Sequence, residues 1–227
     1  MTDLLLYGVT GSPFVRKVQV LLAEKGIEYE LEPVMPFPAT EEFLAMNPAG
    51  RIPVLRDRTI GQEGPAGTIP DSSAICSYLE RKFPNPSFYP EDPFECARAL
   101  WIEEYADTEL AGPVGMGMFR PMIFPPMSGQ ERDIETARKT FHEKLPPVFD
   151  YLEGLIKDQE YLVGQQVSIA DIAVATQFVN MELAGGKVDP ARWPDLAALV
   201  NRMHARESFA HSIVEVGKSF PPHGIEF

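Results

Sequence analysis

The sequence predicts a protein in two parts, an α/β layer with a mixed sheet followed by an all-helical region. Up to about residue 84, short apolar runs bounded by glycine or proline alternate with helical patterns. After the proline-rich stretch Pro84–Pro93, every periodic segment has helical spacing. We therefore expect domains at residues 1–84 and 94–227, joined by a linker at 85–93.

Four strands and three helices are expected in the first part. Ser12 is a favoured N-cap, and Pro13 suits the first helical position because an N–H would be unpaired there anyway. The strands are expected at Leu4–Tyr7, Glu28–Val34, Ile52–Leu55 and Thr68–Pro70, and the helices at Pro13–Lys25, at Thr40–Met46 and from Asp71 onward.

The periodic segments of the second part are all expected to be helical. Ser168 and Asp171 have the spacing of a capping box, in which each residue satisfies an N–H group of the other, so a helix is expected to begin there. Pro146-Pro147 is expected to kink or split a long helix. The other helical patterns are Arg98–Leu110, Glu131–Lys157 and Trp193–Arg206, the last being the expected final helix.

The formal net charge of −13 argues against nucleic acid as a partner, because neutralising phosphates requires clustered Lys and Arg. The charge is uneven. Residues 1–85 hold eight Lys/Arg against eleven Asp/Glu, a net of −3, which leaves −10 for the remainder. An acidic small molecule is therefore expected to bind the first part, at locally basic groups or backbone N–H groups.

Membrane and metal sites are not expected. No apolar run approaches about 18 residues, and the N-terminus has no signal-peptide pattern. The two cysteines, Cys76 and Cys96, form no C-x-x-C pair and no zinc-ligand spacing. We expect a soluble, cytoplasmic protein without a metal.

Four segments carry a family resemblance: Leu6–Lys17, Asn47–Leu55, Ile69–Ile75 and Val167–Asp171. In this order and spacing they resemble the cytosolic glutathione transferase family over roughly residues 4–210. The Ser-Pro-Phe motif at Ser12 resembles its serine-type, bacterial-like members. The resemblance implies a thioredoxin-like N-terminal domain that holds glutathione, an all-helical C-terminal domain, a homodimer and a role in detoxification.

Ser12 is the expected catalytic residue. Glutathione reacts as a thiolate, and a hydroxyl donating to the sulfur beside a helix N-terminus lowers the pKa of the thiol. The simpler reading is that Ser12 only caps the helix. Tyr7 is the runner-up, because other family members use a tyrosine of the first strand, although its position equally suits a core aromatic.

The resemblance also implies a glutathione cradle. Pro53 is expected to follow a cis peptide bond, leaving the Ile52 backbone to pair with the cysteinyl amide of glutathione. Asp71 and Ser72 are expected to bind the γ-glutamyl end, although they equally suit a helix cap. Arg51 is expected to pair with a glutathione carboxylate, with a solvated loop cation as the alternative.

The acceptor site is expected at Phe14 and at the Met-rich segment Val114–Met127, with Met116 and Phe119 in its wall. A packed, irregular core loop is the alternative for that segment. No basic residue precedes the expected helix at Thr40–Met46, where serine-type relatives often have one, so the glycyl end of glutathione is expected to be held differently or more weakly.

The expected function is transfer of glutathione to a small hydrophobic electrophile. A glutathione-dependent isomerase, lyase or dehalogenase would use the same thiolate on a different acceptor. A non-catalytic binding protein of the same fold is the third hypothesis, and Ser12, Pro53 and Asp71-Ser72 together argue against it.

Overall fold

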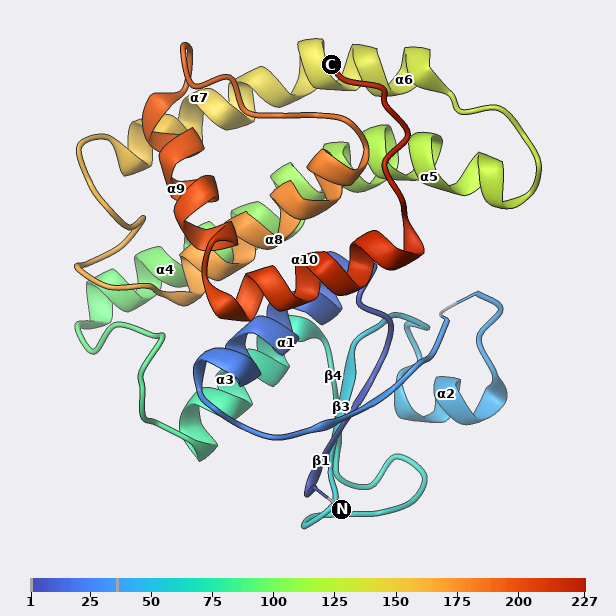
Figure 1. The fold of residues 1–227 in the computed structure, drawn as a ribbon. Coiled ribbons are helices and arrows are strands. Elements are labelled where there is room, and N and C mark those ends of the chain that lie inside the picture. The colour runs from blue at the N-terminus through green and yellow to red at the C-terminus, as the bar shows by residue number, and fades with distance from the viewer. Residues whose placement is uncertain (1, 36) are drawn as a thin grey trace. The chain divides into compact units, whose positions relative to one another are not determined.

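The computed structural model describes residues 2–35 and 37–227 and divides into two compact units, one ending at Ser87 and one running from Phe88 to Phe227. The first unit contains a mixed four-stranded sheet with helices, and the regular elements described in the second unit are all helices (Figure 1). This confirms the predicted fold class.

The sheet of the first unit has the strand order β2-β1-β3-β4. β1 runs parallel to β2, and β3 runs antiparallel to both β1 and β4. The strands are β1 (Leu4–Tyr7), β2 (Glu30–Glu32), β3 (Val54–Asp57) and β4 (Thr68–Pro70), and the helices are α1 (Pro13–Glu24), α2 (Glu41–Met46) and α3 (Ser72–Lys82).

Alternating side chains of the strands face opposite sides of the sheet, and helices cover both sides. Leu5, Tyr7 and Val54 pack in one buried cluster with Phe43 and Met46 of α2. Figure 1 shows α1 and α3 side by side on the other face. The sheet is therefore buried on both faces at its centre.

Two predicted strands differ from the observed ones. The strand predicted at Ile52–Leu55 begins at Val54 instead, because Pro53 has no N–H for the ladder. The strand predicted at Glu28–Val34 is reduced to β2, which pairs only with β1 at the edge of the sheet.

The second unit packs around α8 (Ile169–Leu183), in which every residue from Ile169 to Met181 is buried. The predicted capping box at its start is confirmed. The other elements are α4 (Pro93–Tyr105), α5 (Arg120–Met127), α6 (Ile134–Lys139), α7 (Leu145–Ile156), α9 (Pro194–His204) and α10 (Glu207–Ser219), together with the π-helical segments η1 (Ala106–Leu110), η2 (Pro113–Phe119) and η3 (Thr140–Lys144).

Two expectations for the helical unit are wrong. Trp193–Arg206 does not hold the final helix, because α10 follows α9. The irregular loop considered for Val114–Met127 is helical throughout, as η2 and α5. Gly117 permits this packing, since a Cβ there would lie 2.5 Å from Oγ1 of Thr140 in η3.

Candidate functional site

Three of the predicted site segments lie at the same end of the sheet. Tyr7, the last residue of β1, pairs with Val54, the first residue of β3, and Val54 pairs with Pro70, the last residue of β4. At this end of the sheet, the chain therefore leaves β1, enters β3 and leaves β4. The segments beyond these three residues carry Ser12, Ile52-Pro53 and Asp71-Ser72.

Ser12 caps α1, as its position before Pro13 predicts. Its extended backbone (φ −79°, ψ 125°) aims the side chain at the first turn, where Oγ accepts from Val15 N–H at 3.5 Å. This contact is long, and accepting it leaves the hydroxyl proton available for donation. The cap interpretation is confirmed, and the half-buried hydroxyl remains able to donate to a ligand.

The connection from β1 to α1 requires a glycine. Gly8 has φ 150°, and a Cβ there would lie 2.5 Å from Cγ2 of Val15. Its N–H donates to Glu32 C=O at 3.0 Å, which fixes the chain just beyond β1. The segment that carries Ser12 is thereby held close to the sheet.

Tyr7 lies in the core, with 8% of its surface exposed. Its hydroxyl accepts from Nε of the buried Arg56 at 3.0 Å, and the Arg56 guanidinium also donates to Gly64 C=O at 2.8 Å. The side chain faces α2 in the cluster described above. This is the environment of a structural aromatic residue with a satisfied polar end.

The Ile52-Pro53 peptide bond is cis, which confirms that prediction. Among the described residues, the Ile52 backbone takes part in no hydrogen bond. Asn47 holds the preceding turn, because its Nδ2 donates to Arg51 C=O at 2.7 Å. The Arg51 side chain is exposed to solvent. The Ile52 backbone could therefore pair with an extended ligand, next to the positive charge of Arg51.

Asp71 and Ser72 form the start of α3. Asp71 Oδ1 accepts from Ser73 N–H at 2.9 Å and from Ala74 N–H at 3.1 Å, so the cap interpretation is confirmed. Asp71 also has φ 80° and ψ 130°, an unfavourable conformation for a residue with a Cβ. Strain of this kind persists mainly at functional sites. Ser72, with 4% exposed, lies at the positive end of the helix.

Two buried cations beside the site had no predicted role. Arg16 Nη2 donates to Thr10 C=O at 2.8 Å, and burial lowers the pKa of this guanidinium. Lys17 Nζ donates to Ser73 Oγ at 3.0 Å and so joins α1 to the first turn of α3. Both side chains are fully buried. Helical periodicity gives no signal for them, since charged residues usually mark an exposed face.

The predicted acceptor residues occupy two environments. Phe14 is half-buried in the first turn of α1, in the sheet-containing unit. Met116 and Phe119 belong to η2 in the helical unit, where Met116 is 62% exposed and Phe119 only 6%. The Phe119 ring packs edge-on against Phe124 and Phe220.

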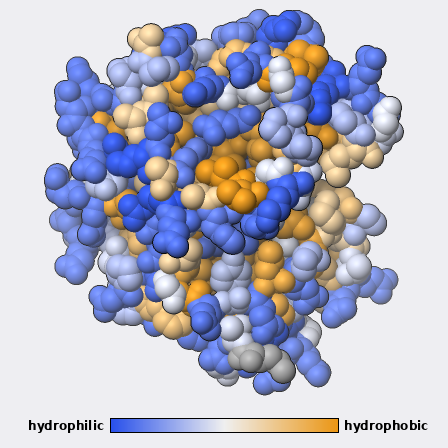
Figure 2. Space-filling model, viewed as in Figure 1, coloured by the Kyte–Doolittle hydropathy of each residue, from blue (hydrophilic) through white to orange (hydrophobic). Residues whose placement is uncertain are grey.

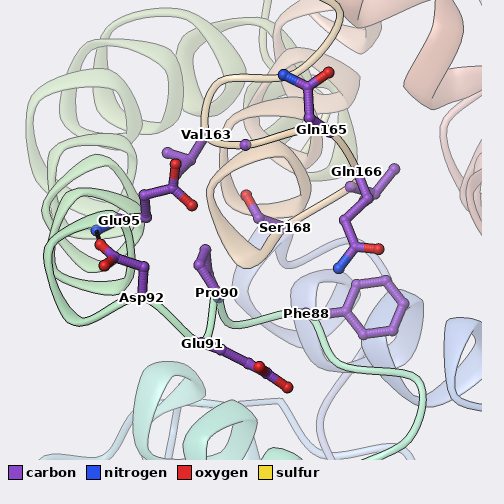
Figure 3. A pocket seen from close by; sticks show the side chains of 11 residues that line it. Phe88, Pro90, Glu91, Asp92, Glu95, Val163, Gln165, Gln166 and Ser168 are labelled. Atoms are coloured by element: carbon purple, nitrogen blue, oxygen red, sulfur yellow. Dashed lines mark hydrogen bonds between the residues drawn. The ribbon is translucent and has the colours of Figure 1, made fainter.

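A pocket of about 330 Å³ in the helical unit is lined by acidic side chains. Glu91, Asp92 and Glu95 line it from the start of α4, and residues 163–168 line it from the loop before α8 (Figure 3). Three carboxylates disfavour a ligand with two carboxylates of its own, such as glutathione. No predicted site residue lines this pocket.

Residues 2–35 and 37–227 contain no group of three or more His, Cys, Asp or Glu side chains placed to hold a metal ion. No helix in that part of the chain has the length and apolarity to cross a membrane.

Comparisons with known proteins match both units. The model for the N-terminal domain of glutathione S-transferase matches residues 6–87, and that for the C-terminal domain matches residues 119–211. The uncharacterized GST-like protein YibF of Escherichia coli (strain K12) is 34% identical over 211 residues, which cover 91% of this chain and 96% of YibF. Maleylacetoacetate isomerase of Mus musculus is 29% identical, covering 90% and 89%.

Solved structures resemble the chain over nearly its whole length. A glutathione S-transferase of Methylobacterium radiotolerans, in complex with glutathione sulfonate, has a TM-score of 0.72 at 30% identity and covers 92% of this chain and 94% of its own. One of Sinorhizobium meliloti has a TM-score of 0.83 at 24% identity, covering 98% and 97%, which supports the fold.

Proposed function

The chain belongs to the glutathione S-transferase family, and on this premise we propose that it is a serine-type glutathione transferase. Glutathione is the co-substrate, and its thiolate attacks a small hydrophobic electrophile. The main support for the proposal is the pairing of Tyr7 with Val54 and of Val54 with Pro70. Because of this register, Ser12, Ile52 and Ser72 all lie in segments just beyond the same end of the sheet. The relative in complex with glutathione sulfonate supports the choice of ligand.

In this proposal Ser12 stabilises the thiolate. A free thiol with a pKa of about 8.5 is only a few per cent ionised near neutral pH. The Ser12 hydroxyl donates to the sulfur while Oγ keeps its contact with Val15 N–H. The N-terminus of α1 adds the positive end of the helix dipole, so both effects favour the anion.

The rest of the cradle binds the tripeptide. The open Ile52 backbone pairs with the cysteinyl amide of glutathione, like an added strand. The γ-glutamyl carboxylate binds the Ser72 hydroxyl and the N–H groups of α3, and Asp71 takes the ammonium through Oδ2, since Oδ1 caps the helix. Arg51 pairs with a glutathione carboxylate, and Phe14 contacts glutathione and the acceptor.

A second candidate reaction is isomerisation. It is favoured by the 29% identity to a mouse maleylacetoacetate isomerase over 90% of the chain. The thiolate would add to the acceptor and leave again, so glutathione would not be consumed. Measuring the loss of free thiol during turnover separates the two reactions.

We also propose a homodimer, with an exposed aromatic strip as part of its interface. Trp101 is 54% exposed, and its Nε1 donates to Tyr151 Oη at 2.8 Å. The Tyr105 and Tyr151 rings lie 4.6 Å apart, and Phe94, on the same helix as Trp101, is 73% exposed. Large exposed aromatics of this kind are enriched in protein interfaces. The cytoplasmic location stays a prediction.

The function is tested with glutathione-agarose and an aryl halide. The wild-type chain is expected to be retained and to conjugate the halide, whereas Ser12→Ala lowers kcat by about 10²-fold because an oxyanion-type donor is lost. Retention should persist in Ser12→Ala, since the cradle residues are intact. A chain that neither binds the resin nor consumes the halide would contradict the proposal.

A further inference from the structure

The chain after α10 forms a strap on the helical unit. Residues 221–227, which we call the C-terminal strap, contain no helix or strand, and Figure 1 shows them leaving α10 and running toward α6. His223, Ile225 and Phe227 are half-buried, whereas the residues between them are exposed. One side of the strap is therefore packed, and the other side faces solvent.

The strap lies close to the backbone that follows α8. Phe227 N–H donates to Gly185 C=O at 3.0 Å, and the Phe227 ring lies 6.1 Å from the Phe141 ring of η3. Gly185 has φ 95°, and a Cβ there would lie 2.3 Å from the carbonyl oxygen of Ile225. Glycine at this position therefore permits the close approach of the strap.

His223 uses both ring nitrogens in holding the strap. Nε2 lies 3.1 Å from the C=O of Leu183, the last residue of α8, and Nδ1 accepts from Ile225 N–H at 3.1 Å. Because Nδ1 accepts, the proton of the neutral ring is on Nε2, which donates to Leu183 C=O. One uncharged tautomer thus makes both contacts, one within the strap and one to α8.

A protonated ring fits this position poorly. Protonation places an N–H on Nδ1, where it faces the N–H of Ile225, so that contact is lost. Burial and the positive charge of Arg132 lower the pKa of His223, and the hydrogen bond to Leu183 opposes them only in part. Arg132 itself donates to Met122 C=O of α5, which holds the guanidinium in place.

The other charged groups around the strap do not offset Arg132. Glu182, beside the end of α8, lies 3.5 Å from Nδ1 of His204. Glu226 of the strap and His142 of η3 are exposed. Within residues 2–35 and 37–227, Arg132 is the one charged side chain whose field acts on His223. Near neutral pH the ring is therefore uncharged.

We propose that His223 is a latch, which holds the C-terminal strap while its ring is neutral and releases the strap when the ring takes up a proton. The released ring is hydrated and away from Arg132, so it binds the proton more tightly than the docked ring does. Docking is therefore complete above about pH 6.5 and weakens by at most about tenfold per pH unit as the pH falls further. The latch lies wholly within the helical unit and does not depend on the transferase reaction.

Amide hydrogen exchange of Phe227, followed by NMR between about pH 7.5 and about pH 5, tests the latch. In the wild-type chain, the protection factor of this amide, corrected for the intrinsic exchange rate, is expected to fall on acidification. Ala184 N–H, which donates to Asn180 C=O at 3.1 Å, is the internal control and should keep its protection. Unchanged protection at Phe227, or equal losses at both amides, would overturn the inference.

Variants of two histidines separate the latch from a general effect of acid. His223→Gln keeps an uncharged amide that cannot titrate, so the protection of Phe227 should no longer depend on pH. His223→Ala loses the donor to Leu183 and should give low protection at both ends of the range. His211→Gln is the matched control, because it removes an exposed histidine of α10, and it should behave like the wild type. A full pH response in His223→Gln would assign the titration to another group.

Arg132→Gln tests the electrostatic part of the latch. Without this positive charge the docked ring takes up a proton more easily, so acidification should cost less protection at Phe227 than in the wild type. A purely structural role of His223 predicts no such change in the pH response. An unchanged or larger loss of protection in Arg132→Gln would therefore also count against the latch.

Discussion

Ser12 and Tyr7 carry the two hydroxyls considered for the role of thiolate stabiliser, and their surroundings differ. Tyr7 is buried, and its hydroxyl is occupied by the Arg56 guanidinium, which in turn holds Gly64. The Ser12 hydroxyl makes a long contact with Val15 N–H, at the positive end of α1. The Tyr7 hydroxyl is thus engaged within the core, whereas the Ser12 hydroxyl can still donate to a ligand, as the proposed function requires.

Opposite effects are expected when the two hydroxyls are removed. Tyr7→Phe leaves a buried Arg56 donor without its acceptor and should lower the free energy of unfolding by about 1–3 kcal/mol, with kcat within about threefold of wild type. Ser12→Ala should leave unfolding nearly unchanged, because the cap is weak, and lower kcat. Urea unfolding and the aryl halide assay measure both. If Tyr7→Phe alone abolished turnover, Tyr7 would be the thiolate stabiliser.

At the scale of elements, local signals in the sequence predicted most of the fold. The cap of α1 was predicted from Ser12-Pro13, and the start of α8 from the capping box of Ser168 and Asp171. The position of β4 was also predicted correctly. α10 was missed because it buries little: Phe209, Ser212 and Val216 are its buried residues, and no side chain caps its start. The helicity of residues 113–127 was not predicted because glycine and proline lower helix propensity. Only the packed structure shows that a Cβ at position 117 would collide with Thr140 of η3.

The candidate site was predictable in parts. Ser12, Pro53 and Asp71 each occur in a local motif, and their segments lie at the same end of the sheet. Arg16 and Lys17 were not predictable, because their burial depends on contacts far along the chain, such as Lys17 with Ser73. The strained backbone of Asp71 has no sequence signature either.

The start of α8 should be the most sensitive cap in the helical unit. Asp171 is buried, and burial raises the pKa of its carboxyl group. Its oxygens accept from the N–H groups of Ser168 and Leu162, both at 2.8 Å. Asp171→Ala should therefore lower the free energy of unfolding by about 2–4 kcal/mol, measured by urea denaturation.

Asp133 provides the matched control for this prediction. It caps α6 through Thr136 N–H at 3.0 Å but is exposed to solvent. Water replaces the lost contact there, so Asp133→Ala should cost about 1 kcal/mol or less. Equal losses for the two variants would contradict the importance assigned to the buried cap.

At the scale of the whole molecule, a largely hydrophilic surface is interrupted by a few exposed apolar side chains. Hydrophilic side chains cover most of the face shown in Figure 2. Against this background, the strip of Trp101, Tyr105 and Tyr151 is a candidate for contact with a second copy of the chain.

The strip predicts a specific effect on assembly. Trp101→Glu places a charge in the proposed interface and should shift the protein from dimer to monomer in sedimentation velocity. Val214→Glu, which adds the same charge at a 60% exposed apolar position of α10 outside the strip, serves as the control. A wild-type chain that sediments as a monomer, or a Trp101→Glu variant that remains fully dimeric, would contradict this interface.

The central claim is that the N-terminus of α1 and the Ser12 hydroxyl keep the sulfur of bound glutathione ionised. Titrating the thiolate absorbance of the glutathione complex against pH tests this most directly. We predict that binding lowers the pKa of the thiol by about two units from its free value of about 8.5, and that Ser12→Ala reverses most of this shift. A bound thiol that ionises at the same pH as free glutathione would contradict the account.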